Sequence, residues 1–373
     1  MRILHVAETA RGGVGSYLEE IAPLQARRYG GDSVRVLMPE DDARLFPGLQ
    51  GARVCGFAQG NGSRAARSWR MLRRAYAECR AWSPDVVHLH STGAGLARPL
   101  LRLTAAGARI VYCAHGWAFD RDVPPATRRT IAIAERALAA FCHAVVCISS
   151  NDHQRALDIG IAPQRCRLVL NGIADLEPAT QPSTSRLWPA GCLRILFVGR
   201  LYRQKGVDLL YRAMQRLGPE AYAVVVGQSV VGGSADPAPP DNVHVTGWLP
   251  RAEIDALHRS AQVFVAPSRW EGLPLAALEA MRASLPVVAS RVGGLQELVA
   301  DGWSGRLVEA GDVDQLTAAL RGADPAALAR MGLHGRERFL QRFGVQRVVQ
   351  ELDGVYRDIL DRGRAKRPLA IGG

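Results

Sequence analysis

Short runs of Val, Ile and Leu alternate along the chain with longer stretches in which apolar residues recur every three or four positions. In the first half these apolar runs lie at residues 2–7, 33–38, 85–89, 109–113, 144–148 and 166–170. Apolar strands separated by helical stretches are typical of parallel β-sheets that helices cover on both faces. The pattern therefore predicts an α/β fold.

The same pattern begins again after a segment rich in Pro and Ser. The second series of apolar runs lies at residues 193–199, 222–227, 243–247, 263–267 and 286–290. We therefore predict two doubly wound, Rossmann-like domains: an N-terminal domain at residues 1–175, a linker at 176–192, a second domain at 193–343, and a C-terminal helix at 344–373 that crosses back to the first domain. Because ligands of such folds bind outside the carboxyl ends of the strands, we expect the site in a cleft between the domains.

Length and composition describe a soluble globular protein. The chain has 373 residues, of which 48% are hydrophobic and 22% charged, and no apolar run reaches the roughly 18–20 residues that a membrane span requires. The N-terminus is typical of a buried strand rather than of a signal peptide. Seven cysteines without a CxxC pair favour a cytoplasmic protein, in which Cys113, Cys142 and Cys147 fill the core.

The charge balance is basic, with 47 Lys and Arg against 35 Asp and Glu. This excess suits nucleic acid, an anionic membrane surface or phosphorylated small molecules. No nucleic-acid-binding module can be recognised, so we expect no nucleic-acid partner. Phosphates and lipid head groups are the better candidates.

Two glutamates bracket the mostly apolar segment SRWEGLPLAALEAM at residues 268–281. Glu271 precedes a helix that begins near Pro274, and Glu279 lies more than one turn inside it. The free amides at the start of that helix would bind a phosphate, and the carboxylates would accept hydrogen bonds from sugar hydroxyls. The structural alternative is a charge at the helix start and an exposed helix residue.

A second anion-binding pattern follows the strand at residues 193–199. Arg200 comes directly after that strand, and Lys205 follows five residues later. A planar guanidinium and an ammonium at a strand end suit a diphosphate, although two ordinary surface cations would look the same in this fragment alone.

Together, FVGRLYRQKG, EGLPLAALEAM and ASRVGGLQELV resemble the retaining nucleotide-sugar glycosyltransferases of family 4, which have the GT-B fold of two facing Rossmann-like domains. The segments GGVGSYLEEI, AHGW and RLVLNGI resemble further motifs of that family, so the resemblance covers almost the whole chain. It implies the catalytic residues His115, Arg200, Lys205 and Glu271. It implies a donor site formed by Gly13, Gly15, Arg200, Lys205, Gly272, Leu273, Pro274, Leu275, Glu279, Gly293 and Gly294.

The resemblance also implies a role for each group. Arg200 and Lys205 hold the donor diphosphate, Glu279 binds the ribose hydroxyls and Glu271 contacts the donor sugar. His115 lies beside the anomeric region of the transferred sugar. Gly13 and Gly15 flank the reaction centre, while Gly293 and Gly294 bring backbone amides close to the sugar or phosphate. The loop at 228–242 departs from the family pattern, because Gln228 stands after the strand's final glycine, where many relatives carry an acidic residue. This loop is rich in Gly and Pro, and we expect it to be mobile.

The implied reaction transfers a sugar from a UDP-sugar or GDP-sugar to an acceptor hydroxyl with retention, without a metal ion or other cofactor. We expect a glycan or lipid-linked acceptor, as in cell-surface polysaccharide synthesis, and a peripheral position on the inner face of the cell membrane. The alternative is a catalytically inactive GT-B protein that only binds sugar nucleotides.

Other enzyme classes account for fewer of these residues. A glycosidase also uses two carboxylates but needs no phosphate-binding cations. A dehydrogenase would need the third glycine of GxGxxG, which the loop at Gly13–Gly15 lacks. A metal-dependent transferase would use Asp120 and Asp122, and His88 and His90 also have metal-like spacing. We interpret His88 and His90 instead as a core residue and a cleft residue, because no third ligand is recognisable nearby.

The segment at residues 63–82 carries six arginines and one acidic residue. Read as a helix, it places Trp69, Leu72, Tyr76 and Cys79 on one apolar stripe that packs inward. The arginines are then either simply solvated or form a face that an anionic membrane surface attracts.

Overall fold

The computed structural model describes residues 1–373 except residues 50, 59–62, 106, 176–186, 230–237 and 366–373. It divides into two compact units, Met1–Asn171 with Val345–Gly373, and Gly172–Gly344. The first unit ends before the predicted boundary at residue 175, because the Ile173 amide already donates to the Phe343 carbonyl within the second unit. Parts of the predicted linker (176–186) and of the predicted loop (230–237) lie outside the described residues.

The first unit is built on a parallel sheet of seven strands in the order β3-β2-β1-β4-β5-β6-β7. These strands are β1 (Ile3–Ala7), β2 (Val34–Pro39), β3 (Arg53–Phe57), β4 (Val86–His90), β5 (Arg109–Cys113), β6 (Ala144–Cys147) and β7 (Cys166–Leu168). All six predicted runs form strands. The apolar pattern does not predict β3, because this edge strand leaves its first two residues exposed.

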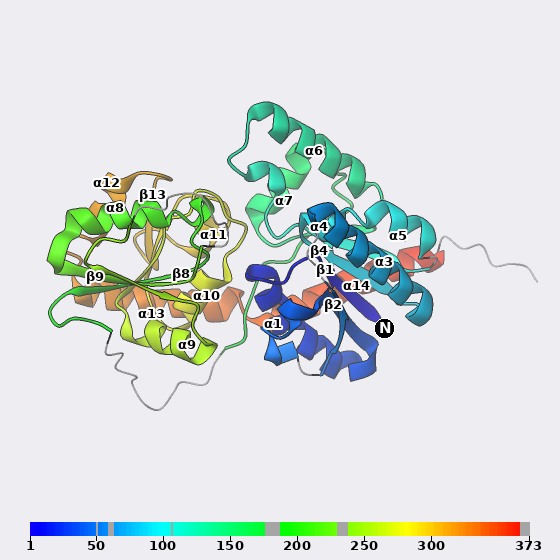
Figure 1. Ribbon diagram of the computed structural model, residues 1–373, viewed down its shortest axis with the longest axis horizontal. Coiled ribbons are helices and arrows are strands. Elements are labelled where there is room, and N and C mark those ends of the chain that lie inside the picture. Colours follow the sequence, from blue (N-terminus) through cyan, green and yellow to red (C-terminus); the bar gives the residue numbers. More distant parts are fainter. Residues whose placement is uncertain (50, 59–62, 106, 176–186, 230–237, 366–373) are drawn as a thin grey trace, which may run out of the picture. The chain divides into compact units, whose positions relative to one another are not determined.

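Helices cover both faces of this sheet (Figure 1). They are α1 (Gly13–Tyr29), α2 (Glu40–Ala43), α3 (Arg64–Trp82), α4 (Ser91–Gly95), α5 (Arg98–Thr104), α6 (Pro125–Ala139), α7 (Ser150–Asp158) and α14 (Val345–Ala365). The apolar side chains of α3, α5 and α6 pack with one face of the sheet, while α1 packs on the other face and against α14. Cys113, Cys142 and Cys147 are free thiols buried in this unit, as predicted.

The second unit has a six-stranded parallel sheet in the order β10-β9-β8-β11-β12-β13. Its strands are β8 (Leu193–Val198), β9 (Ala221–Val226), β10 (Val243–Gly247), β11 (Val263–Ala266), β12 (Val287–Ser290) and β13 (Gly305–Val308). Its helices are α8 (Val207–Leu217), α9 (Arg251–Ser260), α10 (Leu275–Arg282), α11 (Leu295–Leu298), α12 (Val313–Leu320) and α13 (Pro325–Arg342). Helices α8 and α12 cover one face, and α9, α10 and α13 cover the other (Figure 1).

In each sheet the first strand lies in the interior and the chain winds outward from it in both directions. β1 lies between β2 and β4, and β8 lies between β9 and β11. The connections on either side of such a strand diverge, which leaves room beyond the carboxyl ends of the central strands. These strand ends are therefore where a ligand site is expected in each unit. No helix in the described part of the chain is long and apolar enough to cross a membrane.

Candidate active site

The loops that follow β8 and β11 meet at the carboxyl ends of these neighbouring strands. The Arg269 amide donates to the Gln204 carbonyl at 2.7 Å, which links the two loops. Gly206 has φ of 68°, and a Cβ there would lie 2.0 Å from the Pro267 carbonyl oxygen, so only glycine fits. The close approach of these loops brings Lys205 and Glu271 together although 66 residues separate them in sequence.

Lys205 and Glu271 form a salt bridge with Nζ 2.5 Å from Oε1. The same oxygen accepts a hydrogen bond from the Ser268 hydroxyl at 2.9 Å. The Glu271 side chain is only 7% exposed, and low solvent exposure strengthens the attraction between the two charges. The pair thus holds an ammonium group at the strand ends. Arg200, the other predicted diphosphate ligand, is exposed at the start of the same loop.

Glu279 lies on α10, whose N-cap is Pro274. Its side chain is 16% exposed and its carboxylate lies 3.7 Å from the Arg251 guanidinium. The alternative interpretation of Glu279 as an exposed helix residue is therefore wrong. The side chains of Leu273 and Leu275 are buried, so these two residues would reach a ligand through backbone groups.

The predicted glycine pair after β12 packs directly against the Glu271 loop. The Gly294 amide donates to the Gly272 carbonyl at 2.6 Å. A Cβ at Gly293 would lie 1.9 Å from the Glu271 carbonyl oxygen, and one at Gly294 would lie 2.2 Å from that of Gly272. The close contact between the two loops therefore explains by itself why both positions are glycines. The Gly294 amide already donates a hydrogen bond within the protein.

In the first unit the two predicted glycines of the β1–α1 loop differ. A Cβ at Gly15 would lie 2.2 Å from the Ala10 carbonyl oxygen and would overlap the Phe46 ring, so the fold itself requires this glycine. A Cβ at Gly13 would meet no atom within 4 Å. Packing within the protein therefore does not explain why residue 13 is a glycine. Of the two glycines, Gly13 is the better candidate for a position where a bound ligand leaves no room for a side chain.

His115 follows β5 with a left-handed backbone, φ of 54°, which is uncommon for a residue with a Cβ and often marks a functional position. Its Nε2 lies 2.9 Å from Nδ1 of His90, and the Tyr17 ring of α1 packs edge-on against it. Desolvation lowers the pKa of His115 to about 3, so the imidazole is neutral at pH 7.

Comparison with known proteins identifies the family. The model of the family described as Glycosyltransferase Family 4 matches residues 11–175, and that of Glycosyl transferases group 1 matches residues 185–323. The D-inositol 3-phosphate glycosyltransferase of Thermobifida fusca is 32% identical over 328 residues, which are 80% of this chain and 75% of the relative. The chain belongs to glycosyltransferase family 4.

Two further proteins similar to this glycosyltransferase bear on its fold and function. The Escherichia coli UDP-Gal:alpha-D-GlcNAc-diphosphoundecaprenol alpha-1,3-galactosyltransferase is 27% identical over 296 residues, covering 74% of this chain and 76% of that protein. The Anabaena protein HepE, whose structure was solved in complex with UDP-glucose, superposes with a TM-score of 0.81 at 20% identity. The match covers 96% of this chain and all of HepE, and it confirms the GT-B fold.

The structure of this glycosyltransferase corrects the interpretation of the histidines on β4. His88 and His90 are both fully buried, so His90 is not a cleft residue. The third histidine that was missing from the sequence pattern is His5, which pairs in register with His88 on the neighbouring strand. Within the described residues, His5, His88 and His90 form the one group of potential metal ligands close enough to share an ion. Neither periodicity nor spacing indicated His5, because it comes from a different strand.

Of the two aspartates that a metal-dependent transferase would use, Asp120 and Asp122, the first is engaged by a cation. The Arg155 guanidinium donates to Asp120 Oδ1 through Nε at 2.9 Å and Nη2 at 2.6 Å. An ion pair within the first unit thus accounts for this acidic residue of the DRD segment.

Helix α3 differs from the predicted stripe. Met71, Ala75 and Cys79 form its buried face, whereas Trp69 is 59% exposed and Tyr76 is 38% exposed. Leu72 is partly buried and packs against the same core, so Leu72 and Cys79 of the predicted stripe face inward, as predicted, whereas Trp69 and Tyr76 do not. The prediction placed Trp69 and Tyr76 on the buried face because both have large apolar rings. In the structure both rings are exposed, and smaller residues fill that face.

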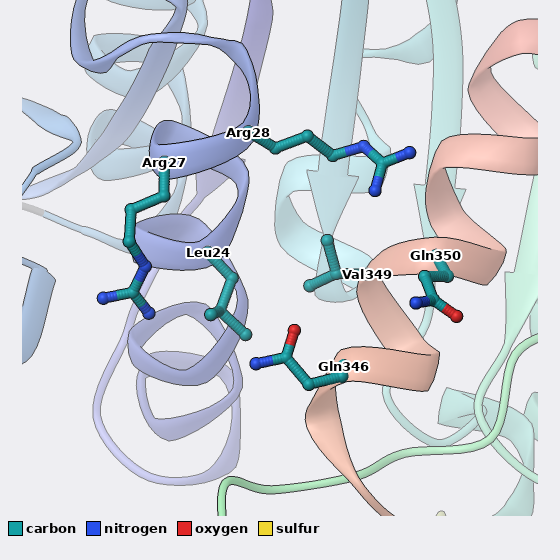
Figure 2. A pocket seen from close by; sticks show the side chains of 6 residues that line it. All are labelled: Leu24, Arg27, Arg28, Gln346, Val349 and Gln350. Atoms are coloured by element: carbon teal, nitrogen blue, oxygen red, sulfur yellow. The ribbon is translucent and has the colours of Figure 1, made fainter.

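A surface pocket of about 540 Å³ lies between α1 and α14 (Figure 2). It is lined by Leu24, Arg27, Arg28, Gln346, Val349 and Gln350. None of the predicted site residues lines it. Arg28 reaches Asp353 of α14 at 2.7 Å, which is a bond within the unit rather than one reserved for a ligand.

Proposed function

We propose that this family 4 glycosyltransferase moves a sugar from a UDP-sugar or GDP-sugar to a hydroxyl of a lipid-linked glycan, with retention and without a metal ion, in the synthesis of a cell-surface polysaccharide. The observation that carries the proposal is the Lys205–Glu271 pair at the carboxyl ends of β8 and β11. The roles of the individual residues are part of the proposal.

The leaving diphosphate is the group whose charge grows most in the transition state. Arg200 and Lys205 lie in the loop after β8, and the backbone amides of the first turn of α10 follow the loop after β11, so a diphosphate would bind beside both. Preorganised donors and cations of this kind stabilise developing negative charge strongly. They can replace the divalent cation that other transferases use, which is why we propose metal-independent transfer.

Retention is proposed to follow from attack on the face that the diphosphate leaves. Glu271, the carboxylate nearest to the proposed sugar position, is engaged by Lys205 and Ser268, which suits binding better than nucleophilic attack. A short-lived oxocarbenium-like ion pair then avoids a covalent intermediate. The departing phosphate oxygen accepts the proton of the acceptor hydroxyl, so no enzymic base is needed.

A lipid-linked acceptor is supported by the name of the E. coli relative, which specifies a diphosphoundecaprenol-linked acceptor. It is also supported by α3, on which Trp69, Arg73, Tyr76 and Arg80 are exposed. Their spacings of four, three and four residues place all four side chains on one helix face. Aromatic rings and arginines together suit the interface of an anionic membrane.

The donor assignment is tested with a panel of UDP-, GDP- and ADP-sugars. One nucleotide sugar should raise the melting temperature of the protein, and its turnover should release the nucleoside diphosphate faster when a short-chain lipid-diphosphate sugar is added. NMR of the product should show the anomeric configuration of the donor, and EDTA should leave the rate unchanged. Binding without turnover would favour the inactive sugar-nucleotide-binding protein, and loss of the rate in EDTA would overturn metal independence.

The membrane assignment is tested by sedimentation with vesicles that contain phosphatidylglycerol. Arg73→Gln with Arg80→Gln should reduce binding by about thirtyfold, because each of the two arginines contributes roughly 1 kcal/mol near an anionic surface. The matched control removes the same charge from the second unit, through the exposed Arg259→Gln and Arg330→Gln. If the wild type does not sediment with these vesicles at low salt, or if both double variants lose binding equally, the α3 face is not the docking surface.

A further inference from the structure

Four buried or partly buried side chains form a continuous hydrogen-bonded chain through the first unit. Gln25 Oε1 lies 2.7 Å from Nε2 of His5, and His5 Nδ1 lies 2.9 Å from Nε2 of His90. His90 Nδ1 in turn lies 2.9 Å from Nε2 of His115. The chain connects an amide on α1 to His115, which the proposed function takes, from the family resemblance, to lie beside the transferred sugar.

All three imidazoles in this chain are neutral at pH 7. Burial lowers the pKa of His5 to about 4 and that of His115 to about 3, and it lowers the pKa of His90 well below its ordinary value. A neutral imidazole has one N–H donor and one acceptor nitrogen. Each ring must therefore donate at one end and accept at the other, so the whole chain has only two possible directions.

Gln25 selects between these directions. The atom that lies 2.7 Å from Nε2 of His5 is the Gln25 carbonyl oxygen, which can only accept a hydrogen bond. The same amide also hydrogen-bonds to the Tyr356 hydroxyl. His5 Nε2–H therefore donates to Gln25.

The remaining protons follow in order. Because Nδ1 of His5 carries no proton, it accepts from Nε2–H of His90. Nδ1 of His90 then accepts from Nε2–H of His115. His115 is left with a protonated Nε2 that faces the interior and an unprotonated Nδ1.

We propose that Gln25, His5 and His90 are positioning residues that hold His115 as its Nε2–H tautomer, so that Nδ1 accepts a hydrogen bond from a hydroxyl of the transferred sugar. This inference rests on the proposed function for the role of His115. The opposite tautomer would present an N–H donor at Nδ1, to which the same hydroxyl could bind only by accepting rather than by donating. The buried residues of the first unit thereby determine whether the sugar hydroxyl donates to His115 or accepts from it.

A metal ion is the competing interpretation of the same histidines. It would require His5 Nδ1 and His90 Nε2, which already share a hydrogen at 2.9 Å, to separate and both present lone pairs. It would also place two positive charges among fully buried ligands that carry no negative charge. The hydrogen-bonded chain satisfies these two nitrogen atoms of His5 and His90 at no such cost; it does not include His88, whose Nε2 has no hydrogen-bond partner among the described residues.

His88 provides an internal control for this chain. It lies on the same face of β4 as His90, is equally buried, and its ring centroid is 4.3 Å from that of His90. Its Nδ1 pairs with the Tyr356 hydroxyl at 2.7 Å, so it is not a link between Gln25 and His115. Because both imidazoles are fully buried, removing either one should destabilise the protein to a similar extent. Only His90 connects His5 to His115 and so determines which nitrogen of His115 carries the proton.

The first experiment measures the histidine tautomers of the unliganded wild type by long-range ¹H–¹⁵N correlation NMR on ¹⁵N-histidine-labelled protein, with His115→Asn to assign the signals. The proposal expects a protonated Nε2 and an unprotonated Nδ1 at His115. A protonated Nδ1 overturns it. One equivalent of bound metal per chain in elemental analysis overturns it as well, because His5 and His90 would then coordinate the ion.

The second experiment compares three variants. Gln25→Met and His90→Leu should give a mixture of His115 tautomers and lower kcat about tenfold, the loss of one neutral hydrogen bond, with donor KM within about twofold. His88→Leu should keep the His115 tautomer of the wild type. An unchanged tautomer in Gln25→Met, or the same change in His88→Leu, overturns the proposal. If the variants do not fold, the wild-type spectrum alone still decides it.

The NMR measurement requires no substrate, so it separates this inference from the proposed function. Wild-type protein with the Nε2–H tautomer that transfers no sugar from any nucleotide sugar overturns the proposed function and supports the hydrogen-bonded chain. An active transferase with the Nδ1–H tautomer overturns the chain and supports the proposed function.

Discussion

The two units share one architecture but differ in the charge of the side chains at and near the ends of their strands. Beyond β8 and β11 the second unit gathers charged groups, with Lys205 bound to Glu271 and Arg251 close to Glu279. On β1, at the end of β4 and after β5, the first unit instead brings together three uncharged rings, those of His5, His90 and His115. The same kind of parallel sheet thus presents charged groups in one unit and a neutral imidazole cluster in the other.

Under the proposed function, this difference divides the work of one reaction between the two units. A diphosphate needs fixed positive charge, which the ion pairs of the second unit hold in place. A sugar is uncharged and is recognised by the direction of its hydroxyl hydrogen bonds, which neutral imidazoles in a fixed tautomer can match. Four predictions test whether charge in one unit and neutrality in the other carry these separate functions.

The largest effect is expected from Lys205→Ala, which should lower turnover on the order of 10²-fold by removing one preorganised cation. It also leaves the Glu271 carboxylate without its closest partner. Steady-state release of the nucleoside diphosphate measures the loss. Arg216→Ala removes a cation that pairs with Asp314 on the same unit, and it should retain wild-type turnover. Wild-type turnover in Lys205→Ala would show that the charged strand ends do not bind the diphosphate.

Acidification should destabilise the first unit more than the second. The pKa of His5 is about 4 in the folded protein and about 6.5 when unfolded, so below pH 6.5 the unfolded state binds more protons. Stability therefore falls as the pH falls from about 6.5 towards 4, by about 2 kcal/mol at pH 5 for His5 alone.

His88, His90 and His115 add to this loss in the same direction, because burial lowers each pKa. The second unit has His258, whose pKa burial lowers to about 3. Thermal unfolding at pH 7.5 and pH 5, followed by proteolysis with peptide identification, shows which unit opens first. Equal destabilisation of both units would mean that the neutral cluster is not a distinguishing feature of the first.

Glu279→Ala should weaken binding of the nucleoside diphosphate alone by about tenfold, the loss of one or two hydrogen bonds from ribose hydroxyls. Glu271→Ala should mainly weaken binding of the intact nucleotide sugar. Calorimetric titration with each ligand compares the two variants. Matching losses for both ligands would remove the division between ribose and sugar carboxylates.

The smallest effect is expected at Gly13. Because a Cβ there meets no protein atom, Gly13→Ala should leave the melting temperature unchanged or slightly higher, since alanine favours a helix by up to about 1 kcal/mol. Turnover should still fall severalfold if a ligand occupies that space. Gly15→Ala is the contrasting variant and should destabilise the fold, because its Cβ overlaps Phe46 and Ala10. Full activity in Gly13→Ala would place the donor elsewhere.

Much of the fold could be predicted from local patterns. Each buried parallel strand is a short apolar run, and the segments around Gly206 and Pro274 carry their turn and helix-start signals in adjacent residues. Edge strand β3 escaped because its exposed residues carry no such run. The face of α3 that packs inward was predicted only in part, because the helix presents Met71 and Ala75 to the sheet and leaves the larger Trp69 outside.

The sequence by itself determined the two α/β sheets, the family and the segment that carries Glu271 and Glu279, because these depend on residues close together in the chain. Only the tertiary structure decided which side chains meet. His88 and Tyr356 are hydrogen-bonded although 268 residues separate them, and His5 reaches His90 only through the register of β1 with β4. Register and helix packing are set by contacts between distant segments, and no periodicity in either segment records them.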